Sequence, residues 1–188
     1  VRALRLIWNH ACDRDDTLPA NPVRMRGQWH PEKRRDGRIK DSELPAFWKG
    51  IEGLPNSIHR DYLKVILLTG LRRAEAASLR WAEVDLEEKI IRLSGERTKA
   101  HRALHLPMSN ILHDVFVARR SVGLDGPFVF PSNGKSGHLE EPRFAMEQIA
   151  KTTGIRANIH DLRRTYVSVA ENCQISLYSL KRLVNHAT

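Results

Sequence analysis

The sequence predicts a mainly helical α+β domain that carries a small three-stranded antiparallel sheet. Three observations predict it. Apolar residues recur at helical spacing over most of the chain, the segment 84–106 instead alternates short apolar runs with turns, and helical spacing returns after Ser109. The chain has 188 residues, 41% hydrophobic and 28% charged, which is the composition of a globular domain with a real core.

Helical spacing of apolar residues marks the expected helices. They cover residues 1–13, 42–52, 57–69, 71–81, 109–120, 140–152, 160–172 and 176–185. Asp41 or Ser42 is suited to cap the second of these segments, and Ser109 caps the segment that runs to residue 120. Gly70 lets one helix end and the next begin sharply, and Gly154 is a fitting residue just beyond a last helical turn.

The expected strands are short runs of β-like residues. They lie at 84–86, 90–93 and 103–106, separated by turn-like segments at 87–89 and 94–99. A further apolar run at 128–131 is expected to be buried and to end in a loop.

Composition divides the chain into three parts. Residues 1–25 contain the end of a helix and a break at Pro19 and Pro22, residues 26–41 form a basic linker, and residues 42–188 form the main domain. The linker is either a solvated connector or a strap that follows a line of phosphates. Because the first residue is Val1 and not Met, we expect the chain to start inside a longer gene product.

Charge is the most informative feature of the composition. Lys and Arg number 31 against 22 acidic residues, a formal net charge of +9 with a pI near 10.0. A domain this basic usually meets a polyanion, and nucleic acid is the leading candidate. A membrane surface is less favoured because no long amphipathic segment combines a basic face with an aromatic one. No apolar run approaches the roughly 20 residues of a membrane span.

Cysteine and histidine spacing argues against a disulfide scaffold and against a metal site. Cys12 and Cys173 form no CxxC pair, which fits a reducing compartment. Strand alternation would put His101 and His105 on one face, but no further ligands accompany them, so we expect no zinc.

The densest motif is Thr-Gly-Leu-Arg-Arg-Ala-Glu at 69–75. Arg72 falls at a helix start, and Glu75 is one turn further on, close enough to orient its guanidinium. An arginine held in this way offers a planar fork to two phosphate oxygens. A plain surface ion pair is the alternative for this motif taken alone.

A second motif, His-Asp-Leu-Arg-Arg-Thr at 160–165, places His160 and Arg163 on one face near a helix N-terminus. The positive end of the helix dipole suits a phosphate there, and a histidine can move a proton near neutral pH. A capping histidine and a solvated arginine are the alternative. Lys99 in the turn between two strands, and His186 just after a helix, are further candidates that are ordinary when taken alone.

Together these four motifs resemble the catalytic domain of the tyrosine recombinases, the phage-integrase family. Thr-Gly-Leu-Arg-x-x-Glu, a hairpin lysine, His-x-Leu-Arg-Arg-Thr and a closing Leu-x-x-His occur in the family's order and at family-consistent separations. The resemblance covers about residues 40–188, and residues 1–25 look like the last helix of the family's preceding core-binding domain. Asn185 stands where the family often has glycine, which affects only the local turn.

The resemblance implies DNA strand cleavage and rejoining through a 3′-phosphotyrosyl link, without ATP or a metal. Arg72 and Arg163 would grip the non-bridging oxygens of the phosphate, and His186 would add a hydrogen bond. Lys99 would protonate the leaving 5′-oxygen, and His160 would help to accept the proton of the nucleophile. The remaining member of the set, Glu75, would support Arg72.

The resemblance also implies a nucleophilic tyrosine shortly after His186, whereas this chain ends at Thr188. We therefore expect a fragment that lacks its nucleophile and forms no covalent link to DNA. The tyrosines present are Tyr62, Tyr166 and Tyr178, and the latter two are interpreted as packing residues.

The implied partner is double-stranded DNA at an attachment or recombination site. The expected DNA-contacting residues are Lys33, Arg34, Arg35, Arg38, Arg73 and Arg164. The resemblance implies a tetramer on DNA for the full-length protein, a monomeric fragment, no cofactor, no metal, and the cytoplasm of a bacterial cell, encoded by a phage or mobile element. The alternative is a DNA-binding module that kept the fold and lost catalysis. A type IB topoisomerase shares the chemistry but is disfavoured by the Thr-Gly-Leu-Arg segment.

Overall fold

The computed structural model describes residues 2–23, 37–99, 101–123 and 126–184. The chain divides into two compact units, Val1–Asp36 and Gly37–Thr188. The second unit thus starts a few residues before residue 42, where the sequence predicts the start of the main domain. Ile39, which is 1% exposed, belongs to its core.

The first unit contains one helix, α1 (Arg2–Cys12), within the range expected for the first helical segment. The chain after it folds back along the helix. Asn21 Nδ2 donates to Arg5 O at 3.0 Å, and Trp8 Nε1 donates to Pro19 O at 3.1 Å. Leu4, Leu6 and Ile7 are more than 60% exposed, so α1 presents an apolar face to solvent within this unit.

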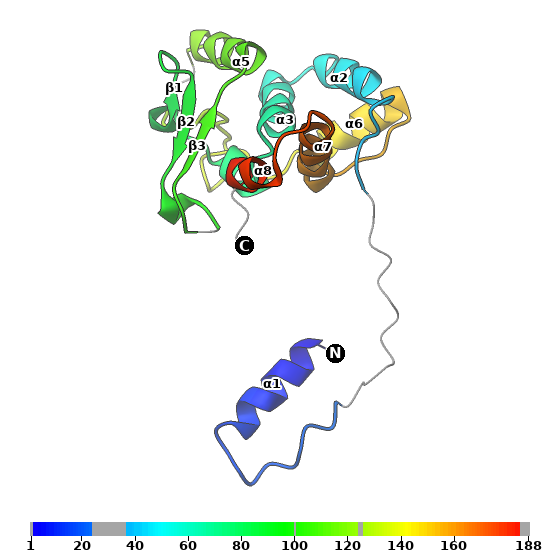
Figure 1. The fold of residues 1–188 in the computed structure, drawn as a ribbon, viewed down its shortest axis with the longest axis vertical. Helices are drawn as coiled ribbons and strands as arrows, with labels where there is room; N and C mark the ends of the chain where they lie inside the picture. Colours follow the sequence, from blue (N-terminus) through cyan, green and yellow to red (C-terminus); the bar gives the residue numbers. More distant parts are fainter. Residues whose placement is uncertain (1, 24–36, 100, 124–125, 185–188) are drawn as a thin grey trace. The chain divides into compact units, whose positions relative to one another are not determined.

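The second unit is helical with a small sheet at one side, as the sequence predicts (Figure 1). Its elements are α2 (Leu44–Glu52), α3 (Ser57–Thr69), α4 (Arg73–Ala77), β1 (Val84–Asp85), β2 (Ile90–Leu93), β3 (Leu104–Pro107), α5 (Asn110–Ser121), α6 (Arg143–Thr153), α7 (Ile159–Asn172) and α8 (Leu177–Leu183). Single 3₁₀ turns at Trp81–Glu83 and Gly95–Arg97 flank the first two strands.

The sheet has the order β1-β2-β3 with both pairs antiparallel. Ile91 pairs with Val84 on one side and with Leu106 on the other. Side chains alternate between the faces, so that Ile91 and Leu106 are buried while Arg92 and His105 are exposed. The strands match the expected runs to within a residue at either end.

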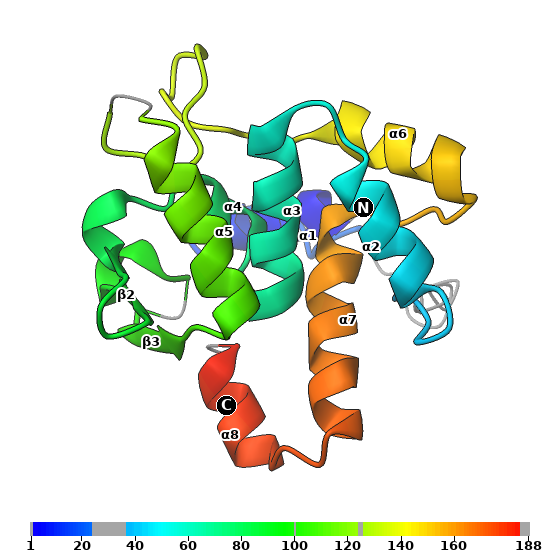
Figure 2. The ribbon, with the colours of Figure 1, turned by 90° about the horizontal axis from the view of Figure 1, so that it is seen from above.

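Helix α3 forms the centre of the core. Figure 2 shows it between α5 and α7, and it also contacts α2 and α4. Its residues Tyr62, Leu63, Val65 and Ile66 are fully buried. The helix spans the range that the sequence predicts, and Asn56 caps it by accepting from Ile58 N at 2.9 Å.

Two other helix ends confirm the residues expected there. Ser109 Oγ accepts from Leu112 N at 3.3 Å at the start of α5, and Gly154 ends α6 in the left-handed region with φ +76°.

Two expectations about helices are wrong, one about the extent of a helix and one about a cap. The helix expected at 71–81 is only α4, because the backbone around Leu79 is extended: Leu79 O accepts from Val129 N at 2.8 Å, and Arg80 bridges to Phe128. Neither Asp41 nor Ser42 caps α2, which begins at Leu44 without a side-chain cap.

Candidate active site

The junction between α3 and α4 positions the first arginine. Gly70 adopts φ +65°, which glycine reaches without a Cβ clash, and this turn places Arg72 at the N-cap of α4. Glu75 then binds Arg72 twice, accepting from its backbone N at 3.0 Å and from Nη1 at 2.9 Å. Glu75 is 5% exposed, so the pair is fixed on the carboxylate side. The orienting role that the sequence predicts for Glu75 has the geometry it requires.

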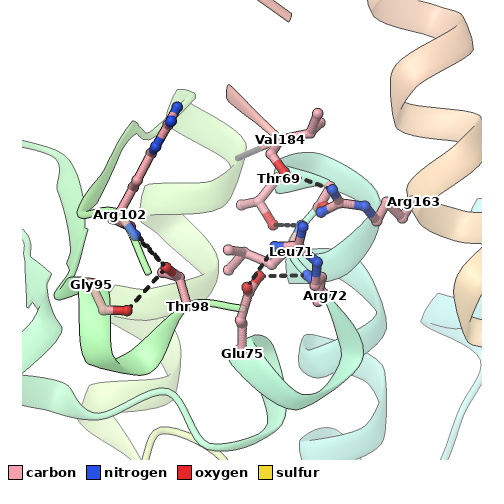
Figure 3. Close-up of polar contacts among 10 residues, drawn as sticks. Thr69, Leu71, Arg72, Glu75, Gly95, Thr98, Arg102, Arg163 and Val184 are labelled. Carbon is pink, nitrogen blue, oxygen red and sulfur yellow. Dashed lines mark hydrogen bonds and ion pairs between the residues drawn. The ribbon is translucent and has the colours of Figure 1, made fainter. Parts of the chain in front are cut away.

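The second arginine, Arg163, lies in α7 and is buried. Its Nη1 donates to Gly70 O, and its Nη2 donates to Val184 O at 2.6 Å. Arg163 thus ties the end of α3 to the end of α8, both of which are distant from it in the sequence. Figure 3 shows the guanidinium groups of Arg72 and Arg163 close together.

The charges of the two arginines act on one another. Burial lowers the pKa of Arg163, the positive charge of Arg72 lowers it further, and Glu75 opposes the shift. Because a guanidinium remains protonated in proteins, two cations lie side by side, and the Glu75 carboxylate binds Arg72. This excess of fixed positive charge is what a tetrahedral oxyanion requires.

His160 lies in the first turn of α7, one turn before Arg163. The residue is exposed, and the part of its ring that packs on the protein is desolvated. This partial desolvation lowers its pKa below the ordinary value for histidine, and the nearby Arg164 and Arg163 lower it further, against an opposing effect of Asp161. The imidazole is therefore mainly neutral near pH 7 and able to accept a proton or a hydrogen bond.

The start of α7 is fixed by residues whose role sequence reasoning missed. Asn158 and Asp161 form a reciprocal capping box, with Asp161 N donating to Asn158 Oδ1 at 3.1 Å and Asn158 N donating to Asp161 Oδ2 at 2.9 Å. The spacing Asn-x-x-Asp was the signal that could have revealed it. The Asp161 side chain also packs on Gly37, where an added Cβ would lie 2.8 Å from Cγ of Asp161.

Thr165 was another unrecognised anchor. Its Oγ1 accepts from Ile39 N at 2.9 Å and donates to Asp161 O at 2.8 Å. The segment entering the domain is thereby held against α7. No local pattern signals this bond, because its partners are far apart in the chain.

The tyrosines occupy three different environments. Tyr62 is fully buried and donates from its hydroxyl to Arg73 O at 3.2 Å, and burial raises its pKa. Tyr166 packs against Gly70, as its interpretation as a packing residue requires. The same interpretation is wrong for Tyr178, which is 72% exposed because its side of α8 faces solvent, with Arg182 above its ring.

Lys99 lies in the connection between β2 and β3, where the sequence places it, and its side chain is exposed. The neighbouring Thr98 anchors that connection by donating to Arg102 O at 2.8 Å (Figure 3). Within the described residues, no hydrogen bond or ion pair joins Lys99 to Glu75 or His160. His186 lies outside the described residues. Of the predicted set, the structure brings together Arg72, Glu75, His160 and Arg163.

The residues predicted to contact DNA fall into two groups. Lys33, Arg34 and Arg35 lie outside the described residues. Arg38 is exposed, Arg73 is half-exposed and pairs with Glu141 at 3.2 Å, and Arg164 pairs with Asp161 at 3.7 Å.

Two kinds of feature are absent from the described ranges. No group of three or more His, Cys, Asp or Glu residues is placed to hold a metal ion there. None of the described helices has the length and apolar character that crossing a membrane requires.

Comparison with known proteins identifies a family in which this fold occurs. A family model described as "Phage integrase family" matches residues 38–188, so the chain belongs to the phage integrase family. It is 31% identical over 155 residues to prophage integrase IntF of Escherichia coli, covering 80% of this chain and 33% of that protein. It is 25% identical over 146 residues to tyrosine recombinase XerA of Pyrococcus furiosus, covering 74% of this chain and 51% of that protein.

Solved structures show the same fold. The integrase of transposon Tn1549, solved in complex with a circular-intermediate DNA, superimposes with a TM-score of 0.82 at 16% identity, covering 100% of this chain and 70% of that one. The XerA recombinase superimposes with a TM-score of 0.69 at 17% identity, covering 80% and 56%. The chain spans about a third of the length of IntF and about half that of XerA.

Proposed function

We propose that this chain is the phosphate-binding part of a site-specific DNA recombinase, which cleaves and rejoins DNA strands through a 3′-phosphotyrosyl intermediate. One observation carries the proposal: Arg72 and Arg163, from distant parts of the chain, are fixed in one cluster beside His160. Membership of the phage integrase family supports it.

The reaction is a transesterification at phosphorus. A tyrosine hydroxyl attacks the scissile phosphate, the tyrosyl O–P bond forms, and the bond from phosphorus to the 5′-oxygen breaks. Arg72 and Arg163 stabilise the negative charge that accumulates on the non-bridging oxygens of the five-coordinate state, and His186 donates a further hydrogen bond. Glu75 keeps the Arg72 fork in position.

Proton transfer is assigned to two other residues. His160 assists removal of the proton from the attacking hydroxyl, which its lowered pKa suits because the neutral imidazole is the form that accepts. Lys99 protonates the leaving 5′-oxygen. For this step the connection between β2 and β3 has to bring the exposed Lys99 to the phosphate.

The attacking tyrosine is assigned to residues outside these 188. Tyr62 is buried in the core, and Tyr166 packs against Gly70. Tyr178 is exposed, with Arg182 above its ring. Each tyrosine therefore has an environment unlike that of a nucleophile beside two arginines.

The partner in this proposal is duplex DNA. The net charge of +9 and the exposed Arg38 and Arg73 support a backbone-contacting surface, to which Arg164 and the basic residues Lys33, Arg34 and Arg35 are assigned as well. The Tn1549 integrase was solved on DNA, as was the XerH recombinase on its difH substrate. A tetramer on DNA, a monomeric free chain, and a bacterial cytoplasmic location complete the proposal.

The experiment that tests it has two stages. In the first, duplex binding by this chain is measured by fluorescence anisotropy at several salt concentrations, and the affinity should fall steeply as salt rises. In the second, the gene product extended to include the nucleophile is mixed with nicked attachment-site DNA, and covalent capture is scored on a denaturing gel.

Two variants of the extended protein make the second stage decisive. Arg163→Ala should reduce capture by about 100-fold or more, because one fixed cationic donor is lost. The exposed Arg143→Ala serves as the matched control and should capture normally. Normal capture by Arg163→Ala would refute the assignment of that arginine, whereas duplex binding without any capture would favour a binding module that has lost catalysis.

A further inference from the structure

A second cationic site lies at the C-terminal end of α5, apart from the candidate active site. A cavity of about 270 Å³ opens there, and its described lining residues are Trp81, Arg119, Arg120, Gly123, Gly126, Phe128 and Val129. Figure 2 shows this end of α5 on the side of the unit remote from α8, whose last residue binds Arg163. The cavity shares no lining residue with the cluster around the active-site arginines.

Arg119 is the unusual member of this lining. Its side chain is 1% exposed, and Nη1 donates to Asp61 Oδ2 at 3.2 Å. Nε and Nη2 are buried and have no hydrogen-bond partner within the described part of the chain. These two atoms form the side edge of the guanidinium, whose parallel N–H groups match two oxygens of a carboxylate or phosphate.

Among the described residues, the charged groups around the cavity leave an excess of positive charge. Arg120 lies over the ring of Trp81 at 4.8 Å, and Arg80 lies over the ring of Phe128 at 5.6 Å. Asp61 is the carboxylate that faces Arg119, and it is already bound to Nη1. Burial lowers the pKa of Arg119, as expected for a cation that is only partly compensated.

Two simpler ways of satisfying Arg119 account for part of these observations. The ring of Phe130, 5.8 Å from the guanidinium carbon, attracts the charge but offers no lone pair to Nε–H and Nη2–H. A water molecule would accept one of these hydrogen bonds but would leave the excess charge in place. An anion with two oxygens meets both requirements at once.

We propose that this cavity binds a small oxyanion, a carboxylate or a phosphate, through the Nε and Nη2 edge of Arg119, with Arg120 at the rim. The volume is just below the roughly 300 Å³ at which drug-sized ligand sites begin, which suits a small ligand.

Nuclear magnetic resonance of the arginine side chains tests this proposal directly. The Nε–H signal of Arg119 is followed while sodium phosphate or sodium acetate is added, with sodium chloride adjusted to keep the ionic strength constant. A saturable shift of this signal with at least one of the two anions is the expected result. The anion that binds identifies the class of ligand.

Variants separate this site from the active site, which should also bind phosphate. Arg163→Ala should leave the Arg119 response unchanged, so a failure of the proposed recombinase function and a failure of this proposal are distinguishable. Arg119→Met should remove the response, and its fold is checked by circular dichroism. Arg120→Gln alters only the exposed rim and should weaken anion binding by about threefold or more without disturbing the buried pair. The exposed Arg143→Gln is the matched control.

The proposal fails if neither anion gives a saturable shift at constant ionic strength. It also fails if sodium chloride alone reproduces the shift, since that outcome means general screening of charge. A response of Arg119 that disappears in Arg163→Ala would overturn it as well, because the anion would then bind at the active site.

Discussion

Replacing Gly70 by alanine should both destabilise the domain and disturb the active site. Gly70 has φ +65°, and an added Cβ would lie 3.0 Å from Cε1 of Tyr166 and closer still to Cδ1. The left-handed conformation costs a non-glycine residue about 1–2 kcal/mol. The steric overlap with a half-buried ring adds about 1–3 kcal/mol. We therefore expect the free energy of unfolding to fall by about 3 kcal/mol, a large fraction of the roughly 5–15 kcal/mol of a typical domain.

Urea denaturation followed by circular dichroism measures this loss, and Gly154→Ala provides the matched control. Gly154 has φ +76°, but an added Cβ there meets nothing within 4 Å, so this variant carries the backbone strain without the overlap. It should lose only about 1–2 kcal/mol.

A double-mutant cycle isolates the steric part of the effect. The double variant Gly70→Ala/Tyr166→Ala should be more stable than the sum of the two single effects predicts, because the ring that overlaps has been removed. Gly70 O also accepts from Arg163 Nη1, so Gly70→Ala should weaken phosphate binding by the folded protein. Equal losses in Gly70→Ala and Gly154→Ala, together with additive effects in the cycle, would refute the reasoning.

Two further predictions concern α7. Thr165→Val keeps the side-chain shape but removes the acceptor of the buried Ile39 N–H, and should lower the free energy of unfolding by about 1–3 kcal/mol, whereas Thr165→Ser should lose less. Equal stability of the Val and wild-type proteins in urea would contradict this. His160 should titrate below the roughly 6.5 of a free histidine, because partial desolvation and the neighbouring Arg164 and Arg163 disfavour its protonated form. The unfolded chain then binds the proton more readily than the folded protein does. The free energy of unfolding should therefore decrease as the pH falls from the pKa of the unfolded chain toward the lower pKa of the folded protein, and it should depend less on pH in His160→Asn. Phosphate should raise the pKa of His160 by offsetting the arginine charges, and a midpoint at or above the free value in the absence of phosphate would contradict the assignment.

Local patterns in the sequence were sufficient for several features with local determinants, although the equally local capping box of Asn158 and Asp161 was missed. The range of α3, the cap at Ser109 and the end of α6 at Gly154 follow from spacing within a few residues. The pairing of Arg72 with Glu75 is local for the same reason, since one helical turn separates them.

Features that depend on distant partners were not accessible from such patterns. The predicted helix at 71–81 stops at Ala77 because Val129, far along the chain, takes the carbonyl of Leu79 into a strand-like pair. The partners of Arg163, the carbonyls of Gly70 and Val184, are likewise brought close only by the tertiary fold. Helical periodicity predicted that α8 exists, but not that Tyr178 faces solvent.

The bonds of Arg163 explain how the domain keeps a nearly buried cation beside a second one. Carbonyl oxygens at helix C-termini lack partners within the helix and carry the negative end of the helix dipole. Arg163 binds one such oxygen at the end of α3 and another at the end of α8, so two helix ends offset part of its desolvation and of the repulsion by Arg72. Glu75 is bound to Arg72, and among the described residues no acidic side chain forms an ion pair with Arg163. Correct docking of α8 and correct orientation of Arg163 are therefore one event, and a change that displaces α8 should weaken phosphate binding even though no residue contacting the phosphate has been altered.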